Sequence, residues 1–310
     1  MTGEGMNQAW VLLAPVLLGA IALAGAALNG ALAARAEGRP ALSGSARPML
    51  EVVRLMRQRR RVTVAADRLL WRIGGMALLV IALLKTAVIP FGPWILADIP
   101  VGLVWFNAMD VMVWAAIWLM GWGANSAHAL AGGYRFLAQA ASYELPLMFA
   151  LVTPAVAAQS LRVSEIVDAQ QSLWFVVWMP FAFLVFCASV LAFSAWGPFA
   201  TAASGDIAGG ILTEVSGVDR LLILAGRYAL LATGAAFAVA LFLGGGAGPL
   251  LPEWLWTLVK TLAVLAVFIV VSRRFSGVRP DRLAEVAWVI GLPIMLLQTL
   301  VVSIIVAVRG

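Results

Sequence analysis

Long apolar segments constrain this chain more than any other feature of its sequence. Eight stretches are long enough to cross a bilayer, which needs about 20 consecutive apolar residues. Lipid offers no hydrogen-bond partner to open backbone groups, so each stretch is predicted to be a helix. The sequence therefore predicts an all-α integral membrane protein with about eight transmembrane helices. The predicted spans are residues 9–34, 69–89, 99–120, 137–159, 173–195, 218–243, 251–271 and 285–308.

The composition excludes the soluble classes of protein. Of 310 residues, 63% are hydrophobic and only 12% are charged, whereas a soluble domain is near half apolar and a quarter charged. Cys187 is the single cysteine and His128 the single histidine, so no internal disulfide can form and these two residues cannot build a metal site. We therefore expect no metal and no cofactor bound by this chain. The first span is too long for a signal-peptide core and lacks a basic leader.

The basic residues are distributed unevenly between the predicted loops. The net charge is +6, which in a membrane protein indicates basic cytoplasmic loops rather than nucleic-acid binding. The loops after spans 1, 3, 5 and 7, together with the span ends that adjoin them, hold sixteen arginines, whereas the opposite side holds only Arg162 and Arg309. This bias predicts that both termini are non-cytoplasmic. The sixteen are Arg35, Arg39, Arg47, Arg54, Arg57, Arg59, Arg60, Arg61, Arg68, Arg72, Arg135, Arg220, Arg273, Arg274, Arg279 and Arg282.

The loop of residues 35–68 is the longest stretch outside the predicted spans. Pro48 is suited to open a helix, and apolar residues recur after it at helical spacing between arginines. We expect an amphipathic helix over residues 48–61, lying on the cytoplasmic face. Two roles remain open for this helix. Its arginines would bind anionic lipid, or they would dock a peripheral protein.

Five charged residues lie inside the predicted spans and more than three residues from either end, where a charge costs roughly 2.5–3.5 kcal/mol on insertion scales. They are Lys85, Asp110, Glu144, Arg227 and Lys260. Carboxylates exchange protons, so Glu144 and Asp110 are candidates for a proton path. The alternative is structural: either acid would pair with Arg227 or Lys260 across the bundle. For Asp110 the structural interpretation is preferred. Arg227 cannot relay protons because its guanidinium stays charged.

A series of motifs gives the sequence a family resemblance. Residues 121–126 read GWGANS, residues 129–135 read ALAGGYR, and residues 142–146 read SYELP. Similar agreement occurs at residues 98–103 (DIPVGL) and 213–217 (TEVSG). In order and spacing the chain resembles membrane subunit 1 of respiratory complex I, which is also called the H subunit. A related version anchors membrane-bound [NiFe] hydrogenases and formate hydrogenlyase.

The resemblance implies an interface subunit in a multisubunit oxidoreductase of the cell inner membrane. A protein of this kind holds a peripheral arm with iron–sulfur centres on the cytoplasmic face, walls a quinone chamber and starts a proton path to antiporter-like membrane subunits. Glu144 and Glu214 are similar to acids of that path, which would also include Asp110. The chamber and the docking surface would comprise Arg54, Arg57, Arg61, Arg135, Asp206 and Arg279.

The chain also departs from the family pattern. The acids that usually follow Pro198-Phe199 are replaced, and Asp206 is the only one of that run of acids that is left. A usual glutamate is Phe193, and another is Arg227. Because consecutive acids provide a proton wire, these changes predict a broken or rerouted path. Arg227 would then neutralise Glu144.

Four functions remain open on the sequence alone. The first is the subunit of a quinone-linked, complex-I-like oxidoreductase. The second is the anchor of a [NiFe] hydrogenase or of a formate- or CO-linked complex, which needs no quinone. The third is a structural anchor that does not couple to proton movement. A stand-alone transporter is the fourth, although no pair of broken helices in inverted repeats supports it.

Overall fold

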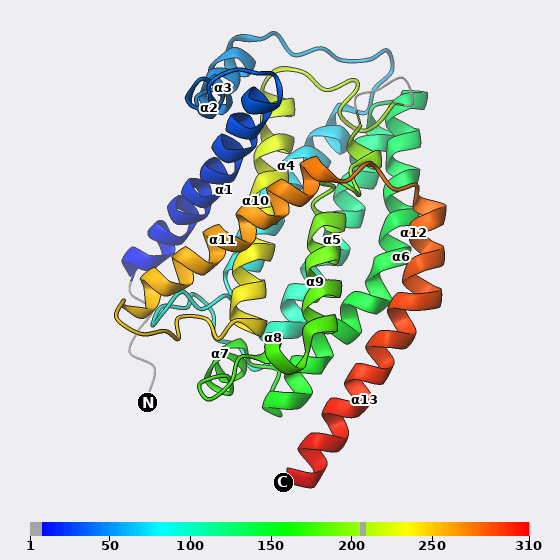
Figure 1. The fold of residues 1–310 in the computed structure, drawn as a ribbon. Helices are drawn as coiled ribbons and strands as arrows, with labels where there is room; N and C mark the ends of the chain where they lie inside the picture. The colour runs from blue at the N-terminus through cyan, green and yellow to red at the C-terminus, as the bar shows by residue number, and fades with distance from the viewer. Residues whose placement is uncertain (1–7, 205–208, 310) are drawn as a thin grey trace.

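The structure, a computed structural model, describes residues 8–204 and 209–309 and is helical throughout (Figure 1). Within these residues the only β-type pairing is an isolated bridge between Phe91 and Trp94. Seven helices are long and apolar enough to cross a membrane, which confirms the all-α membrane class. They are α1 (Gln8–Ala36), α4 (Arg68–Thr86), α5 (Gly102–Gly123), α6 (Ala127–Ala158), α10 (Gly217–Phe242), α11 (Glu253–Arg274), and the C-terminal span of α12 (Pro280–Val286), η2 (Ala287–Gly291) and α13 (Leu292–Arg309).

The predicted span over residues 173–195 differs from the others because it is divided. It comprises α8 (Phe175–Trp178) and α9 (Pro180–Phe193), separated at Met179. Proline disfavours helical backbone at the preceding residue and has no amide proton to continue the helix. At about 1.5 Å per residue, α9 is shorter than the hydrocarbon core. Gln298 of α13 accepts the amide proton of Ala182 at 2.6 Å, satisfying one donor at the start of α9.

Eight crossings still account for the path of the chain. Figure 1 places the start of α1 and the end of α13 at one end of the bundle, whereas α2 (Ala41–Ser45) and α3 (Arg47–Arg57) lie at the other. Because both ends of the described chain are at the same end, the number of crossings is even. The α8–α9 segment, together with α7 (Val163–Asp168) before it, supplies the eighth. Which end faces the cytoplasm stays a prediction from the arginine bias.

The bundle is organised around α10, which packs against α1, α4, α9 and α11. In α10, 78% of an 18-residue apolar stretch is buried. At the other extreme, only 11% of the C-terminal span is buried, and Figure 1 shows α13 diverging from the remaining helices. The contrast follows from composition. Ala and Gly are frequent in α10 and allow close approach of neighbouring helices.

The expected amphipathic helix over residues 48–61 is observed as α3, which ends four residues earlier than expected. A two-helix cap is formed by α2 and α3, packed on α1 and, through α3, on α10. Leu55 is fully buried, while Met49, Val53 and Met56 are exposed. One side of α3 therefore contacts the bundle, and its outer side is both apolar and basic.

Candidate functional site

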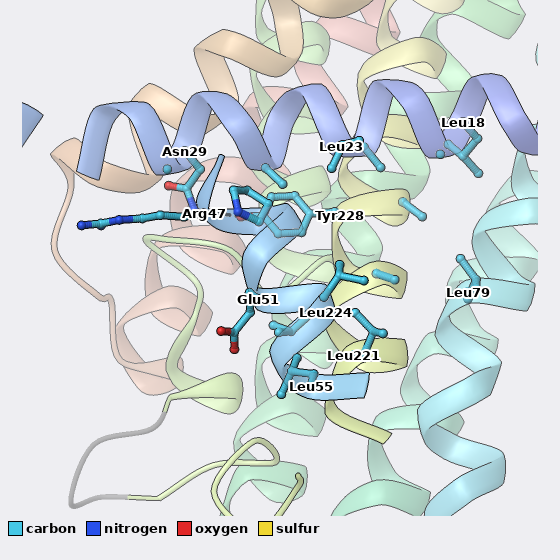
Figure 2. A pocket seen from close by; sticks show the side chains of 18 of the residues that line it. Leu18, Leu23, Asn29, Arg47, Glu51, Leu55, Leu79, Leu221, Leu224 and Tyr228 are labelled. Atoms are coloured by element: carbon cyan, nitrogen blue, oxygen red, sulfur yellow. Dashed lines mark hydrogen bonds between the residues drawn. The ribbon is translucent and has the colours of Figure 1, made fainter. Parts of the chain in front are cut away.

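A large cavity lies where α3 crosses the bundle. Figure 2 shows its lining residues between α1, α3, α4 and α10. The cavity has a volume of about 770 Å³. Most of its wall is aliphatic, and the exposed lining residues Leu23 and Leu50 bring it to the molecular surface. The aliphatic side chains that Figure 2 labels in this wall are Leu18, Leu23, Leu55, Leu79, Leu221 and Leu224.

Polar groups gather at the end of this cavity near α3. Asn29 donates a hydrogen bond to the Tyr228 hydroxyl at 2.9 Å, and Arg47, Glu51 and Arg54 line the same part of the wall. Arg54 is held to Glu51 by a bidentate contact with distances of 2.5 and 2.7 Å. The Glu51 carboxylate raises the pKa of Arg54, so this cation remains charged. Such a cavity fits a molecule with a long apolar part and a polar head.

A second cavity, of about 390 Å³, is predominantly polar and also includes Arg54 in its wall. Arg61, Glu214 and Arg220 line it as well. The Glu214 carboxylate accepts a hydrogen bond of 2.7 Å from Ser126. The two cavities are thus neighbours at Arg54. The structure brings Arg54 and Arg61, which the sequence assigned to the chamber, together with Glu214, which it assigned to the proton path.

The remaining loop residues of the predicted chamber are more dispersed. Arg57 is exposed at the end of α3. Arg135 donates to the Gly209 carbonyl at 2.8 Å. Arg279 forms an exposed ion pair with Asp281. Asp206 lies outside the described residues. His128 is exposed, and no group of three His, Cys, Asp or Glu side chains that could hold a metal occurs in the described part of the chain.

The intramembrane acids have different partners from those expected. Asp110 accepts a 2.8 Å hydrogen bond from Lys85, and both side chains are fully buried. Glu144 accepts one from Asn107 at 3.3 Å. The Lys85 ammonium also lies 3.8 Å from the centroid of the Phe193 ring. Asp110 is thus held in an ion pair, but its cation comes from α4 rather than from α10 or α11.

The expected pairing of Arg227 or Lys260 with a carboxylate is therefore wrong. The Arg227 guanidinium donates to the carbonyls of Ser194 and Ala195 at the end of α9. The last carbonyls of a helix have no partner within it and carry partial negative charge. These ends bind the cations without any acid. Lys260 donates to three carbonyls beyond the end of α10, at 2.7, 3.0 and 2.7 Å, which belong to Leu243, Gly245 and Ala247.

Several polar residues of these sites are not among those expected from the sequence. The sequence marks Lys85 as a charge inside the membrane but does not assign it to a site. Asn29, Asn107 and Tyr228 are not singled out by the sequence, and only the structure places them at these sites. Each is a polar side chain in a long apolar stretch, with Tyr228 next to Arg227 and Asn107 three residues before Asp110. That signal is present in the sequence, because such residues are rare in membrane helices and usually face the bundle interior.

Comparison with known proteins gives the family. The family model described as NADH dehydrogenase matches residues 7–303. This chain belongs to that family, membrane subunit 1 of complex I. The NADH-quinone oxidoreductase H subunit 2 of Geobacter sulfurreducens is 36% identical over 269 residues, which cover 83% of this chain and 82% of that protein.

Two further relatives agree with this assignment. The corresponding H subunit 1 of Geobacter metallireducens is 35% identical over 277 residues, covering 86% of this chain and 84% of the relative. The H subunit of Syntrophotalea carbinolica is 34% identical over 278 residues, with the same coverage of 86% and 84%. As a family member with seven long apolar helices, the protein is a multi-pass protein of the inner membrane.

Proposed function

We propose that this protein is the interface subunit of a multisubunit, complex-I-like oxidoreductase, and that it receives a quinone in the cavity between α1, α3 and α10. The observation that carries the proposal is the pairing of an aliphatic cavity with a polar one, which share Arg54. A quinone combines an apolar chain with a head group whose carbonyls accept hydrogen bonds. The aliphatic wall suits the chain, and the cationic and amide donors suit the head.

The partner subunits follow from the chemistry that this chain lacks. We infer that electrons reach the quinone from iron–sulfur centres in a peripheral, hydrogenase-like subunit. The outer side of α3 is a suitable docking surface, since Met49, Val53 and Met56 lie there beside Arg57, all of them exposed. Exposed apolar groups among cations are typical of a protein interface. Further membrane subunits, antiporter-like in type, would continue the proton path.

Glu144, Asp110 and Glu214 are the proposed proton-carrying acids. Asp110 and Glu144 lie inside the bundle on adjacent helices, and Glu214 lines the polar cavity. The replacement of loop acids after Pro198-Phe199 leaves fewer groups to connect them. That loss favours the second candidate function, the anchor of a hydrogenase or of a formate- or CO-linked complex that operates without quinone.

The proposal is tested by isolating the native assembly. The protein carries a C-terminal tag and is solubilised gently, and co-purifying subunits are identified by mass spectrometry. The same preparation is assayed for NADH, formate and hydrogen oxidation, with and without quinone. Iron–sulfur subunits with quinone-dependent turnover are expected. Turnover indifferent to quinone would instead support the hydrogenase anchor, and a preparation without any redox subunit would contradict both functions.

A cavity-filling variant tests the quinone position directly. Leu224→Trp places a large side chain into the aliphatic cavity and is expected to reduce quinone-dependent turnover about tenfold or more, because overfilling costs about 1–3 kcal/mol. The matched control is Val16→Trp, at a residue of α1 that is 69% exposed. Assembly of both variants is checked by the subunits that co-purify. Equal turnover of the two variants would place the quinone elsewhere.

A further inference from the structure

Three ionisable side chains from three helices meet inside the bundle. Lys85 of α4 and Asp110 of α5 form the 2.8 Å ion pair, with both side chains 0% exposed. Glu144 of α6 accepts a 3.3 Å hydrogen bond from Asn107, which lies on α5 three residues, or one helical turn, before Asp110. The three side chains form what we call the acid–lysine cluster. Among the described residues, Asp110 is the one carboxylate within hydrogen-bond distance of the Lys85 ammonium. Glu144 makes no hydrogen bond to that ammonium.

The formal charge of the acid–lysine cluster is −1 when all three groups are ionised. An uncompensated charge in the membrane interior is strongly unfavourable. Within the membrane, α9 carries Cys187 as its ionisable side chain, and its Phe193 ring next to Lys85 is neutral. On α10 the corresponding ionisable side chains are Tyr228 and Arg227. The Arg227 guanidinium is already bound by the carbonyls at the end of α9. Neither α9 nor α10 therefore supplies a second cation to the cluster.

The hydrogen bonds of the cluster are also incomplete. One oxygen of each carboxylate, Oδ2 of Asp110 and Oε2 of Glu144, is buried and has no partner among the described residues. The Tyr143 hydroxyl lies close to Asp110 yet makes no hydrogen bond of ordinary geometry. Ionised carboxylates only accept, whereas a protonated carboxyl also donates. A single added proton would bring the formal charge to zero and supply a donor.

We propose that Lys85, Asp110 and Glu144 form one site that holds a single exchangeable proton, shared by the two carboxylates, with the Lys85 ammonium as the permanent counter-charge. Uptake changes the cluster from −1 to neutral, and release restores −1; no electron moves. A role of this site in proton transfer rests on the proton path proposed above, whereas the binding of one proton by the cluster does not depend on that path. Lys85 is the residue that keeps the site at one proton rather than two.

Infrared spectroscopy of the purified assembly tests this count without turnover. Protonated buried carboxyls give a C=O stretching band that shifts in D₂O, and difference spectra between variants and the parent protein isolate the cluster. Glu144→Gln and Asp110→Asn are each expected to remove one such carboxyl, because the remaining acid then pairs with Lys85. Lys85→Met is expected to add one. The control, Glu165→Gln, replaces a carboxylate that is 57% exposed and should leave the band unchanged.

The double variant Lys85→Met/Asp110→Asn removes the ion pair as a unit and provides a second measurement if Lys85→Met does not fold. Glu144 is then the only ionisable group of the cluster, and the band that Asp110→Asn removed is expected to return. A band lost in Glu144→Gln but kept in Asp110→Asn would contradict the claim that both carboxylates share the proton. If the band changed in none of the variants, the claim that the cluster binds a proton would be wrong. Because these spectra need no quinone, they stay readable even if quinone-dependent turnover fails.

Discussion

Each of the three cations within the membrane has a different set of acceptors. Lys85 binds a carboxylate, whereas Arg227 and Lys260 bind the carbonyl ends of α9 and α10. Aromatic rings complete the surroundings: the Arg227 guanidinium carbon lies 4.9 Å from the centroid of Trp196, and the Lys260 ammonium 4.1 Å from that of Trp174. In lipid no water replaces a missing acceptor. The backbone ends therefore substitute for carboxylates at two of the three positions.

Replacing Arg227 tests this view at the residue scale. Arg227→Ala is expected to lower the free energy of unfolding by about 1–3 kcal/mol, because the carbonyls of Ser194 and Ala195 are left unsatisfied. Since Glu144 is not a partner of Arg227, the double variant Arg227→Ala/Glu144→Gln should show the sum of the two single effects. Thermal unfolding in detergent measures all three variants. Rescue of Arg227→Ala by Glu144→Gln would mean that the two charges interact after all.

Close contacts between helices position the cavity. Gly30 of α1 and Gly44 of α2 meet backbone to backbone, and a Cβ added at Gly44 would overlap the Gly30 carbonyl oxygen. No other residue type allows this approach. Because α3 follows α2 after a single residue, the contact also places α3 over the cavity. A pair of glycines thus decides where the wall of the cavity lies.

Gly44→Val tests this contact at the scale of the helices. The added side chain should force α2 away from α1, lower the free energy of unfolding by about 1–3 kcal/mol, and reduce quinone-dependent turnover by disturbing the wall that α3 provides. Ala46→Val is the control, because Ala46 is an exposed residue of the same segment. Thermal unfolding and turnover are measured on both variants. Similar values for the two would show that the glycine contact does not position α3.

At the scale of the whole molecule, the two ends of the bundle differ in charge. The loops near α2 and α3 hold most of the arginines, and positive loops stay in the cytoplasm. The end with the start of α1 and the end of α13 should face outward. This orientation would put the polar cavity and the outer side of α3 on the side where a peripheral electron-transfer subunit is proposed.

Labelling of introduced cysteines tests the orientation. Cys187 is first replaced by serine, and a single cysteine is then placed at Val64, which is 90% exposed between α3 and α4, or at Leu250, which is fully exposed between α10 and α11. In intact cells an impermeant maleimide should react with the cysteine at position 250 and spare the one at 64. Permeabilised cells, in which both should react, serve as the control. The reverse pattern would invert the predicted topology.

The sequence alone determined the membrane class, the approximate spans and the charge asymmetry, because lipid imposes one requirement on every apolar stretch, whatever its neighbours are. The break between α8 and α9 at Met179 could also have been predicted from the sequence, because Pro180 follows it. Among the site residues, Arg54, Arg61 and Glu214 followed from the family resemblance, and the structure places them around one cavity.

The tertiary structure decided which groups meet. Lys85 and Asp110 are 25 residues apart, and Arg227 lies 33 residues from the Ser194 carbonyl that it binds. Charge pairing depends on the rotation and depth of each helix, which packing against several neighbours sets and which no single apolar stretch encodes. For the same reason the cavity between α1, α3, α4 and α10 could not be predicted from the sequence. Three of its walls belong to α1, α4 and α10, which are apolar on nearly every side, so their sequences do not mark the side that is left uncovered.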